Sequence, residues 1–379
     1  MFVLPRYSYY AARTYLPAVA TMTTTAPRVV VAAAAAAVGP VSLPAAVPVY
    51  FDHDGGNDDF VALVYLLKHQ NRFNLLGVTI TPANSWWDVG VLATRKVLRL
   101  FSSKDAHEAR IPVAEATLEG VHAFPDEWRL DSCRVNLLPQ LNNFETEEDA
   151  KRFEEEAGDG SNDCVTGQLL LAQTLLAADS PVTVVSTGPL TALAWVLDNF
   201  PEASSKIEKV LIMGGAIDVA GNVSEEGFDG TAEWNIFWDP PAAKRVWDSD
   251  LKLVLTPLDA TNEAPLTKDL ITRLGRQDES VASSIVASIW CFAGAPLLEV
   301  KKPFYAWDLL TVVQLVHPEL FTTTEVECDV VVDGASQGRI VRTGQPDSSG
   351  EGQGRSVTVI HPRDANDLFD VIFRDLGSP

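Results

Sequence analysis

The feature that most constrains the fold is a repeated alternation of short β-branched runs with longer helical ones after residue 47. The first pair is VPVYFD at residues 47–52, typical of a buried strand, followed by DDFVALVYLLKH at 58–69, typical of a helix. Strands that alternate with helices form a mainly parallel sheet that is covered on both faces. We therefore predict an α/β fold with an open, Rossmann-like sheet flanked by helices.

The same pattern predicts the remaining elements. Strands are expected at 75–81, 183–186, 209–213 and 251–258, and helices at 89–101 and 189–200. Near the C-terminus, 326–333 and 356–360 alternate like an antiparallel strand pair, and 365–376 is expected to form a last helix. The acidic segment 143–163 is interpreted as a solvated helix and loop. No linker divides the sequence, so residues 47–379 are predicted to form one domain.

Residues 1–46 differ in composition from the rest of the chain. Residues 1–50 contain no Asp or Glu, whereas Arg6, Arg13 and Arg28 stand among Ala, Ser, Thr and Tyr. The composition of this low-complexity extension suits an organellar transit peptide. It suits equally well an upstream extension with Met22 as an alternative start. The apolar stretch 29–38 is too short to span a bilayer. The protein is expected in the cytoplasm, or in an organelle if the extension is a targeting signal.

Charge and composition restrict the ligand class. The net charge of −22 argues against nucleic acid as a partner, because phosphate backbones require stripes of Lys and Arg. A neutral or cationic small molecule is the easier ligand. The four cysteines have no metal-type spacing and are interpreted as free thiols. The six histidines form no HExxH pair, so zinc-dependent hydrolysis has no support in the sequence.

The candidate site is an aspartate cluster at the end of the first predicted strand. Asp52, Asp54, Asp58 and Asp59 place four carboxylates within eight residues, on a Gly-Gly turn. Ligands bind at the carboxyl ends of strands in open α/β sheets. Carboxylates so close together need a cation or raised pKa values, and oxygen ligands without His or Cys favour calcium or magnesium. In the alternative interpretation Asp58 and Asp59 only cap the following helix, which leaves the other two unexplained.

The segment DHDGGNDDF resembles the DxDxxxDD signature of the nucleoside hydrolases. The resemblance continues, in the order of the family, through STGPLT at 186–191, IMGG at 212–215, AEWN at 232–235, WDP at 238–240 and AWD at 306–308. Within the family, PDEWR at 125–129, DGTAEWN at 229–235 and YAWD at 305–308 are similar to the purine-specific (inosine-adenosine-guanosine-preferring) group. The inosine-uridine group has a histidine at the position of Trp307.

The resemblance implies an activity and a set of site residues. The reaction would be hydrolysis of the N-glycosidic bond of purine ribonucleosides to free base and ribose, as in purine salvage, with Asp54 as general base. A homodimer is also implied. One calcium ion would be held by the side chains of Asp54, Asp59 and Asp308 and by the backbone carbonyl of Thr187. Asp52 would orient these ligands. The expected ribose-binding residues are Asp58, Met213, Asn222, Glu233 and Asn235, and the expected base-binding residues are Asn84, Trp128 and Trp307.

The sequence also departs from the purine-specific pattern. Asn84 stands at a pocket position that is often Asp in that group, and Gly56-Asn57 stands where the group tends to have Asn and then an apolar residue. The segment 294–305 is expected to be a mobile lid, as in the family. Two other functions remain open: a haloacid-dehalogenase-like phosphohydrolase, which would use Asp52 and Asp54, and a non-catalytic calcium-dependent nucleoside binder.

Overall fold

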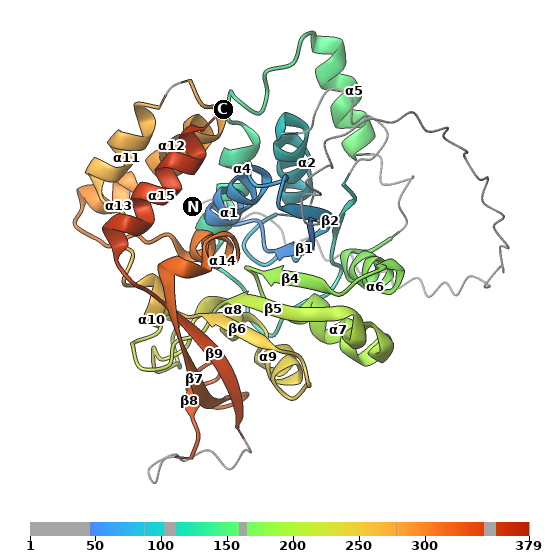
Figure 1. Ribbon diagram of the computed structural model, residues 1–379, viewed down its shortest axis with the longest axis vertical. Coiled ribbons are helices and arrows are strands. Elements are labelled where there is room, and N and C mark those ends of the chain that lie inside the picture. The colour runs from blue at the N-terminus through green and yellow to red at the C-terminus, as the bar shows by residue number, and fades with distance from the viewer. Residues whose placement is uncertain are drawn as a thin grey trace, which may run out of the picture. The chain divides into compact units, whose positions relative to one another are not determined.

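The computed structural model describes residues 46–86, 88–101, 111–158, 165–277, 279–344 and 354–378 (Figure 1). The expected targeting segment lies outside the described residues except for Ala46, and so does Cys164. The other three cysteines are free, as predicted. Among the helices that the structure describes, none combines the length and the apolar character needed to cross a bilayer.

The described part of the chain is built on a nine-stranded sheet with the order β3-β2-β1-β4-β5-β6-β9-β7-β8. Every neighbouring pair from β3 to β9 is parallel. At the other end, β7 runs antiparallel to both β9 and β8. The predicted α/β fold with an antiparallel C-terminal addition is therefore confirmed. The strands are β1 (Val47–His53), β2 (Phe73–Ile80), β3 (Val113–Glu115), β4 (Val182–Ser186), β5 (Ile207–Met213), β6 (Leu253–Thr256), β7 (Phe321–Val330), β8 (Ile340–Arg342) and β9 (Arg355–Pro362).

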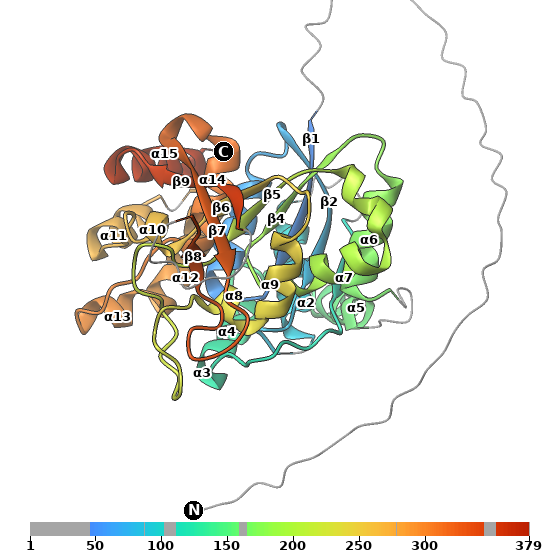
Figure 2. The same ribbon diagram turned by 90° about the horizontal axis from the view of Figure 1, so that it is seen from below.

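Helices cover both faces of the sheet, because successive strand residues point to opposite sides. Val49 and Phe51 pack into the core on one face, and Tyr50 between them packs into the other core. Burying a side chain such as Phe51 contributes about 1.5–3 kcal/mol. The first face is covered by α1 (Asn57–Leu67), α2 (Val89–Phe101), α12 (Val281–Ala293), α14 (Trp307–Val316) and α15 (Ala365–Gly377) (Figure 1). The second face is covered by α6 (Gly167–Ala177), α7 (Thr191–Asn199) and α9 (Pro240–Trp247), as Figure 2 also shows.

The remaining helices are short or lie at the edges of these two layers. The acidic segment contains α5 (Glu147–Gly158), and its residues 159–163 lie outside the described residues. The expected lid, 294–305, is not a plain loop, because it contains α13 (Ala295–Glu299). The others are α3 (Asp126–Arg129), α4 (Asp131–Asn136), α8 (Trp234–Trp238), α10 (Leu258–Thr261), α11 (Lys268–Gly275) and the 3-10 helices η1 (Pro201–Lys206) and η2 (Pro318–Leu320).

The strand order defines where a ligand can bind. The chain builds outward from β1 to β3 on one side and then returns to place β4 on the other side of β1. The connections after β1 and β4 therefore leave the sheet toward opposite faces, which opens a crevice at the carboxyl ends of these two strands. Asp52 on β1 pairs with Ser186 on β4, so the aspartate cluster and Thr187 both lie at this crevice.

Candidate active site

A tight turn carries the aspartates from β1 into α1. Gly55 has a φ of +81°, and a Cβ there would lie 2.6 Å from the side chain of Ser85, so a larger residue would be strained and would clash. The backbone N–H of Gly56 donates to Asp59 Oδ2 at 2.8 Å, which closes the first turn of α1. Asp54 and Asp59 thereby come to the same end of the sheet.

Asp308 joins this cluster from the far end of the sequence. It lies in the first turn of α14, a helix that packs with α1 in the same core. Burial raises the pKa of Asp308 well above its usual range, and repulsion from Asp58 and Asp59 raises it further. Burial and the charge of Asp59 raise the pKa of Asp54 in the same way. Four carboxyl groups from two distant segments therefore interact in one buried place.

Thr187 reaches the cluster at the end of β4. Its backbone N–H donates to the carbonyl of Asp52 at 2.9 Å, and its hydroxyl donates to Asp59 Oδ1. A Cβ on the next residue, Gly188, would lie 2.8 Å from the Cβ of Asp54, so only glycine allows this approach. The carbonyl oxygen of Thr187 accepts a hydrogen bond from Asn235 Nδ2 at 2.9 Å and keeps a second lone pair.

The donor set fits a hard divalent cation. Among the described residues, no Lys or Arg forms an ion pair with these carboxyls, and the nearest basic group is His53. Its Nδ1 accepts the Gly55 N–H at 3.1 Å and lies 3.7 Å from Asp59 Oδ2, which is too long for a hydrogen bond. Within the part of the chain that the structure describes, the buried negative charge is therefore not balanced by a Lys or Arg side chain. Carboxylate and carbonyl oxygens without nitrogen or sulfur are the ligands that calcium and magnesium prefer.

Asp52 and Asp58 occupy different positions in the cluster. Both oxygens of Asp52 are buried without a hydrogen-bond partner, and burial raises its pKa well above the usual range. Burial and the nearby charge of Asp59 raise the pKa of Asp58 to about 7. Asp58 is only partly buried, and its Oδ1 would lie 3.2 Å from a Cβ at Gly56. It is thus the member of the cluster that is open to a ligand.

Three of the residues expected to bind ribose are held together around α8. The amide of Asn235 donates to the carbonyls of Thr187 and Met213, so its Oδ1 is the atom left for a sugar hydroxyl. Glu233 caps α8, where its carboxylate accepts the N–H groups of Asn235 and Gly215. This capping role supports the turn at the end of β5.

The fourth of these residues, Asn222, is exposed, and its Oδ1 accepts the N–H of Trp234 at 3.1 Å. Asn222 is thereby tied to the start of α8. A contact of Asn222 or Glu233 with ribose stays a prediction.

The residues expected to bind the base lie around the same crevice but do not form a visible sandwich. Trp307 is half-buried against Met213 and Leu258. Trp128 is 41% exposed on α3, with its ring centroid 5.5 Å from that of Trp234. Among the ring contacts of the described residues, none joins Trp128 to Trp307. The stacking of a base between these two indoles therefore stays a prediction.

Asn84 lies on the β2 side of the crevice. Its Nδ2 would be 2.7 Å from a Cβ at Gly56, and its Oδ1 is buried without a hydrogen-bond partner. An unpartnered buried oxygen beside the aspartate turn is available to a ligand N–H or O–H group. This position fits the predicted role of Asn84 in contacting the base.

The sequence did not indicate the groups that brace this pocket. Asn57 donates from Nδ2 to Asp131 Oδ2 at 2.7 Å, which ties the start of α1 to α4. The guanidinium of Arg129 donates to the carbonyl of Ser85 and lies 4.1 Å from the centroid of a ring of Trp86, which anchors α3 beside the crevice. These partners are separated by 43 to 74 residues, and no local pattern marks such contacts.

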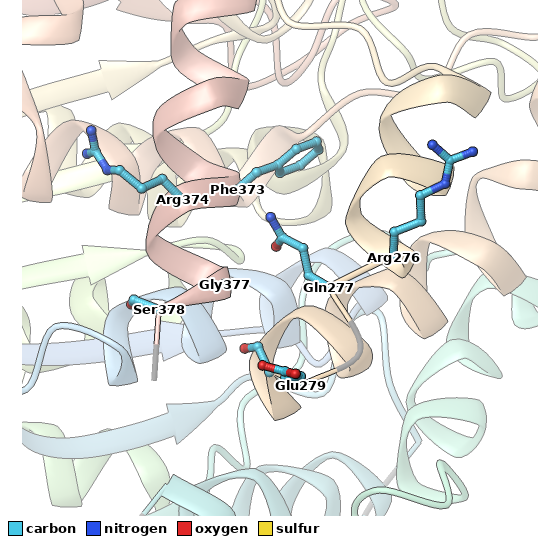
Figure 3. A pocket seen from close by; sticks show the side chains of 8 residues that line it. Arg276, Gln277, Glu279, Phe373, Arg374, Gly377 and Ser378 are labelled. Carbon is cyan, nitrogen blue, oxygen red and sulfur yellow. The ribbon is translucent and has the colours of Figure 1, made fainter.

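A separate surface depression of about 640 Å³ lies between the end of α15 and the segment after α11 (Figure 3). Its labelled side chains include Arg276, Gln277 and Phe373, and it contains none of the predicted site residues. Buried carboxylates and a free carbonyl lone pair occur at the switch point and not here. The candidate active site therefore lies at the carboxyl ends of β1 and β4.

The fold and the site define an α/β protein with a cluster of buried carboxyl groups at the switch point of its sheet, where ligands bind in open α/β sheets. Residues 49–370 match the family described as inosine-uridine preferring nucleoside hydrolase. The pyrimidine-specific ribonucleoside hydrolase RihA of Escherichia coli O127:H6 is 31% identical over 292 residues, which are 74% of this chain and 83% of that protein. The chain belongs to the inosine-uridine preferring nucleoside hydrolase family.

Solved structures agree with this assignment. The inosine-uridine preferring nucleoside hydrolase from Bacillus anthracis superposes with a TM-score of 0.74 and 32% identity, covering 87% of this chain and 99% of that chain. The purine-preferring ribonucleoside hydrolase from Gardnerella vaginalis shares the fold, with a TM-score of 0.65 and 21% identity over 87% of this chain and 98% of that chain.

The predicted family and its reaction class, hydrolysis of the N-glycosidic bond of ribonucleosides, are thus confirmed. The haloacid-dehalogenase alternative is not supported. The predicted purine-specific group is not confirmed, because the relatives include a pyrimidine-specific enzyme.

Proposed function

We propose that this nucleoside hydrolase cleaves purine ribonucleosides in the crevice between β1 and β4, with Asp54 as general base and a calcium ion held by Asp54, Asp59, Asp308 and the carbonyl of Thr187. The observation that carries the proposal is the convergence of buried, unbalanced carboxyls from two segments that are about 250 residues apart in the chain. The carbonyl oxygen of Thr187, which accepts one hydrogen bond and keeps a second lone pair, adds a neutral donor to the same place.

The residues of the chain have separate tasks in this mechanism. A bound calcium ion would orient the attacking water and the ribose hydroxyls and polarise them. Asp54 would accept a proton from the water as it attacks C1′, because calcium is a weak Lewis acid and the water still needs a base. Asp58 and the Oδ1 of Asn235 would accept hydrogen bonds from the sugar hydroxyls.

The electrostatics of the site suit the expected transition state. Breaking the glycosidic bond gives the ribose an oxocarbenium character, with positive charge near C1′. The surrounding carboxyls form a preorganised negative environment for that charge. Asp52 would contribute by fixing the end of β1, since its backbone carbonyl accepts the Thr187 N–H at 2.9 Å.

The proposed purine preference rests on the indoles. Trp307 occupies the residue next to the ligand Asp308, where the inosine-uridine group has a histidine, and an indole cannot protonate the leaving base. Stacking on an indole contributes about 1–3 kcal/mol per base. This contribution should be larger for a purine, because a purine has two rings and a larger stacking surface. Electron-rich indole faces also favour a cationic, protonated purine. The proton would come from solvent.

A pyrimidine preference is the second candidate, and the relative from Escherichia coli favours it. The chain is 31% identical to an enzyme whose name states pyrimidine specificity. Asn84 stands where an aspartate is frequent in the purine-specific group, so its amide offers the base both a donor and an acceptor.

The decisive experiment is a reducing-sugar assay with inosine, guanosine, adenosine, uridine and cytidine, each with and without a calcium chelator. The proposal predicts faster release from the three purine nucleosides and no release with the chelator. Faster release from uridine and cytidine would establish the second candidate. Calcium-dependent binding of inosine without release of ribose over hours would identify a non-catalytic binder. The expected homodimer is tested by light scattering after size-exclusion chromatography.

A further inference from the structure

A second cluster of titratable side chains lies at the other end of α1. His69 follows α1, His317 follows α14, and Asp375 lies near the end of α15. The segment after α1 is beside the amino end of β1, because Val47 N–H donates to the carbonyl of Arg72 at 2.9 Å. The length of α1, about 16 Å for 11 residues, therefore separates this cluster from the aspartates.

Two imidazoles in this cluster converge on one carboxylate oxygen. His317 Nε2 lies 2.7 Å from Asp375 Oδ2, and His69 Nε2 lies 3.3 Å from the same oxygen. The centroids of the two imidazole rings are 6.0 Å apart. The three side chains are 12–14% exposed, so the cluster is largely buried but open to water on one side.

The other nitrogen of each ring is already engaged. His69 Nδ1 lies 2.8 Å from the backbone carbonyl of Tyr65, and His317 Nδ1 lies 2.9 Å from Glu319 Oε1. A carbonyl and a carboxylate can only accept, so the proton of each neutral ring is on Nδ1. Both Nε2 lone pairs then point at a carboxylate oxygen of Asp375, and the lone pairs and the oxygen repel each other. This arrangement requires a cation between the two nitrogens and the oxygen, or a second proton on each ring.

Such engagement of Nδ1 by an oxygen acceptor is the arrangement that orients metal-binding histidines. We propose that His69, His317 and Asp375 form a three-ligand site for a divalent transition-metal ion of the zinc type, with a fourth position open to water. Two imidazoles and one carboxylate are a ligand set that zinc accepts, whereas calcium requires more oxygens. This site is independent of the proposed function at the aspartate cluster.

The three ligand atoms lie within 4.8 Å of one another, and the two distances to Asp375 are close to what a metal needs. Tetrahedral zinc with ligands at about 2.0–2.1 Å separates those ligands by about 3.3 Å. The His69–Asp375 distance of 3.3 Å already matches, and the 2.7 Å between His317 and Asp375 would widen by less than about 1 Å. The hydroxyl of Tyr65 donates to Asp375 Oδ2 at 2.8 Å and would orient the carboxylate. A bound ion would tie α15 to the ends of α1 and α14.

The test uses the full-length protein in saturating calcium, which keeps the aspartate cluster occupied, and zinc chloride as the probe. Bound zinc is measured by elemental analysis after equilibrium dialysis, and cobalt substitution reports the coordination through its visible spectrum. We expect wild-type protein to bind one equivalent. Glu319→Gln, which only weakens the acceptor on His317, should lower the affinity about tenfold, and His69→Ala and His317→Ala should lower it further. His361→Ala, a partly exposed histidine that faces Glu263, is the matched control and should bind as wild type does.

Three outcomes would overturn the proposal. Wild-type protein could bind zinc no better than His69→Ala, in which case the cluster is a set of imidazolium–carboxylate ion pairs. Glu319→Gln and the histidine variants could bind zinc as wild type does while Asp308→Asn loses it, which would place the ion at the aspartate cluster. Finally, every variant, His361→Ala and Asp308→Asn included, could bind zinc as wild type does, which would indicate non-specific surface binding. Because Glu319 is 67% exposed, its variant is expected to fold even if a histidine variant does not.

Discussion

The two ends of α1 carry two clusters that differ in chemistry and in construction. At the carboxyl end of the sheet, Asp54, Asp59 and Asp308 are buried oxygen donors supplied by a strand end and a helix start. At the amino end, His69, His317 and Asp375 are nitrogen and oxygen donors at or near helix ends, and each is partly exposed. The first arrangement suits a hard cation that takes part in chemistry, and the second suits a softer ion in a supporting role.

This difference predicts that removing calcium abolishes activity, whereas disrupting the histidine cluster leaves activity unchanged. A calcium-selective chelator should reduce ribose release to background, because the buried carboxyls would repel each other and no other group would orient the water. Activity measured before and after calcium is restored tests this outcome. His317→Ala should keep wild-type activity in calcium, since His317 lies far from the crevice. Full activity in the chelator would contradict the calcium proposal.

The next largest effect is expected at the general base. Asp54→Asn removes the proton acceptor but keeps the size of the side chain, so kcat for inosine should fall by about 10²–10⁴-fold. Inosine binding, measured by calorimetry in calcium, should change much less. Asp248→Asn, at an exposed aspartate that pairs with Lys244, is the matched control. A kcat within a few-fold of wild type would remove Asp54 from this role.

The same comparison explains what the sequence could predict. The alternation of strands and helices predicted the sheet, and helix α2 begins and ends at the predicted residues, 89 and 101. Strand β3 was missed because its three residues are too few for a period to appear. Helix α6 was missed because its sequence, GQLLLAQTLLA, is apolar on nearly all sides and shows no helical period.

The residues of the site also divide into those that the sequence could predict and those that it could not. Asp52, Asp54, Asp58 and Asp59 are neighbours in sequence, so their local pattern predicted a shared site. The closeness of Asp308 was implied only by family resemblance, and in the structure its carboxyl group interacts with those of Asp58 and Asp59. The Asn57–Asp131 and Arg129–Ser85 contacts and the cluster of His69, His317 and Asp375 are formed by tertiary packing, so no spacing in the sequence could reveal them.

A smaller effect is expected on the side of the crevice where the base would bind. Trp128→Ala should lower kcat/KM for inosine by about 5–150-fold, which corresponds to the loss of about 1–3 kcal/mol of stacking. Trp195→Ala, at a partly exposed indole on α7 that contacts Phe200, is the matched control and should have little effect on kinetics. Unchanged inosine kinetics in Trp128→Ala would rule out the sandwich. A loss that is larger for uridine than for inosine would favour the pyrimidine candidate.

The smallest effect is a pH dependence of stability to which the aspartate cluster should contribute. Burial and the charge of Asp59 raise the pKa of Asp58 to about 7 from an ordinary value of 3.8, so between these pH values the folded protein holds a proton that the unfolded chain has lost. Stability of the calcium-free protein should therefore fall as pH rises from about 4 to 7, which is the opposite of a salt-bridged carboxylate.

Between about pH 4 and pH 7, Tm should fall by several degrees. One kcal/mol of stability corresponds to about 2–4 °C in Tm for a domain of 150–250 residues, and to less in a larger domain. Saturating calcium should flatten this slope of Tm against pH, because the ion replaces the protons in balancing the carboxylates. Asp58→Asn, which cannot ionise, should also reduce the slope, whereas Asp248→Asn, at an exposed aspartate far from any histidine of the second cluster, should leave it unchanged. A slope that persists in Asp58→Asn at full strength would mean that Asp54 and Asp308, whose pKa values are raised in the same direction, titrate in its place.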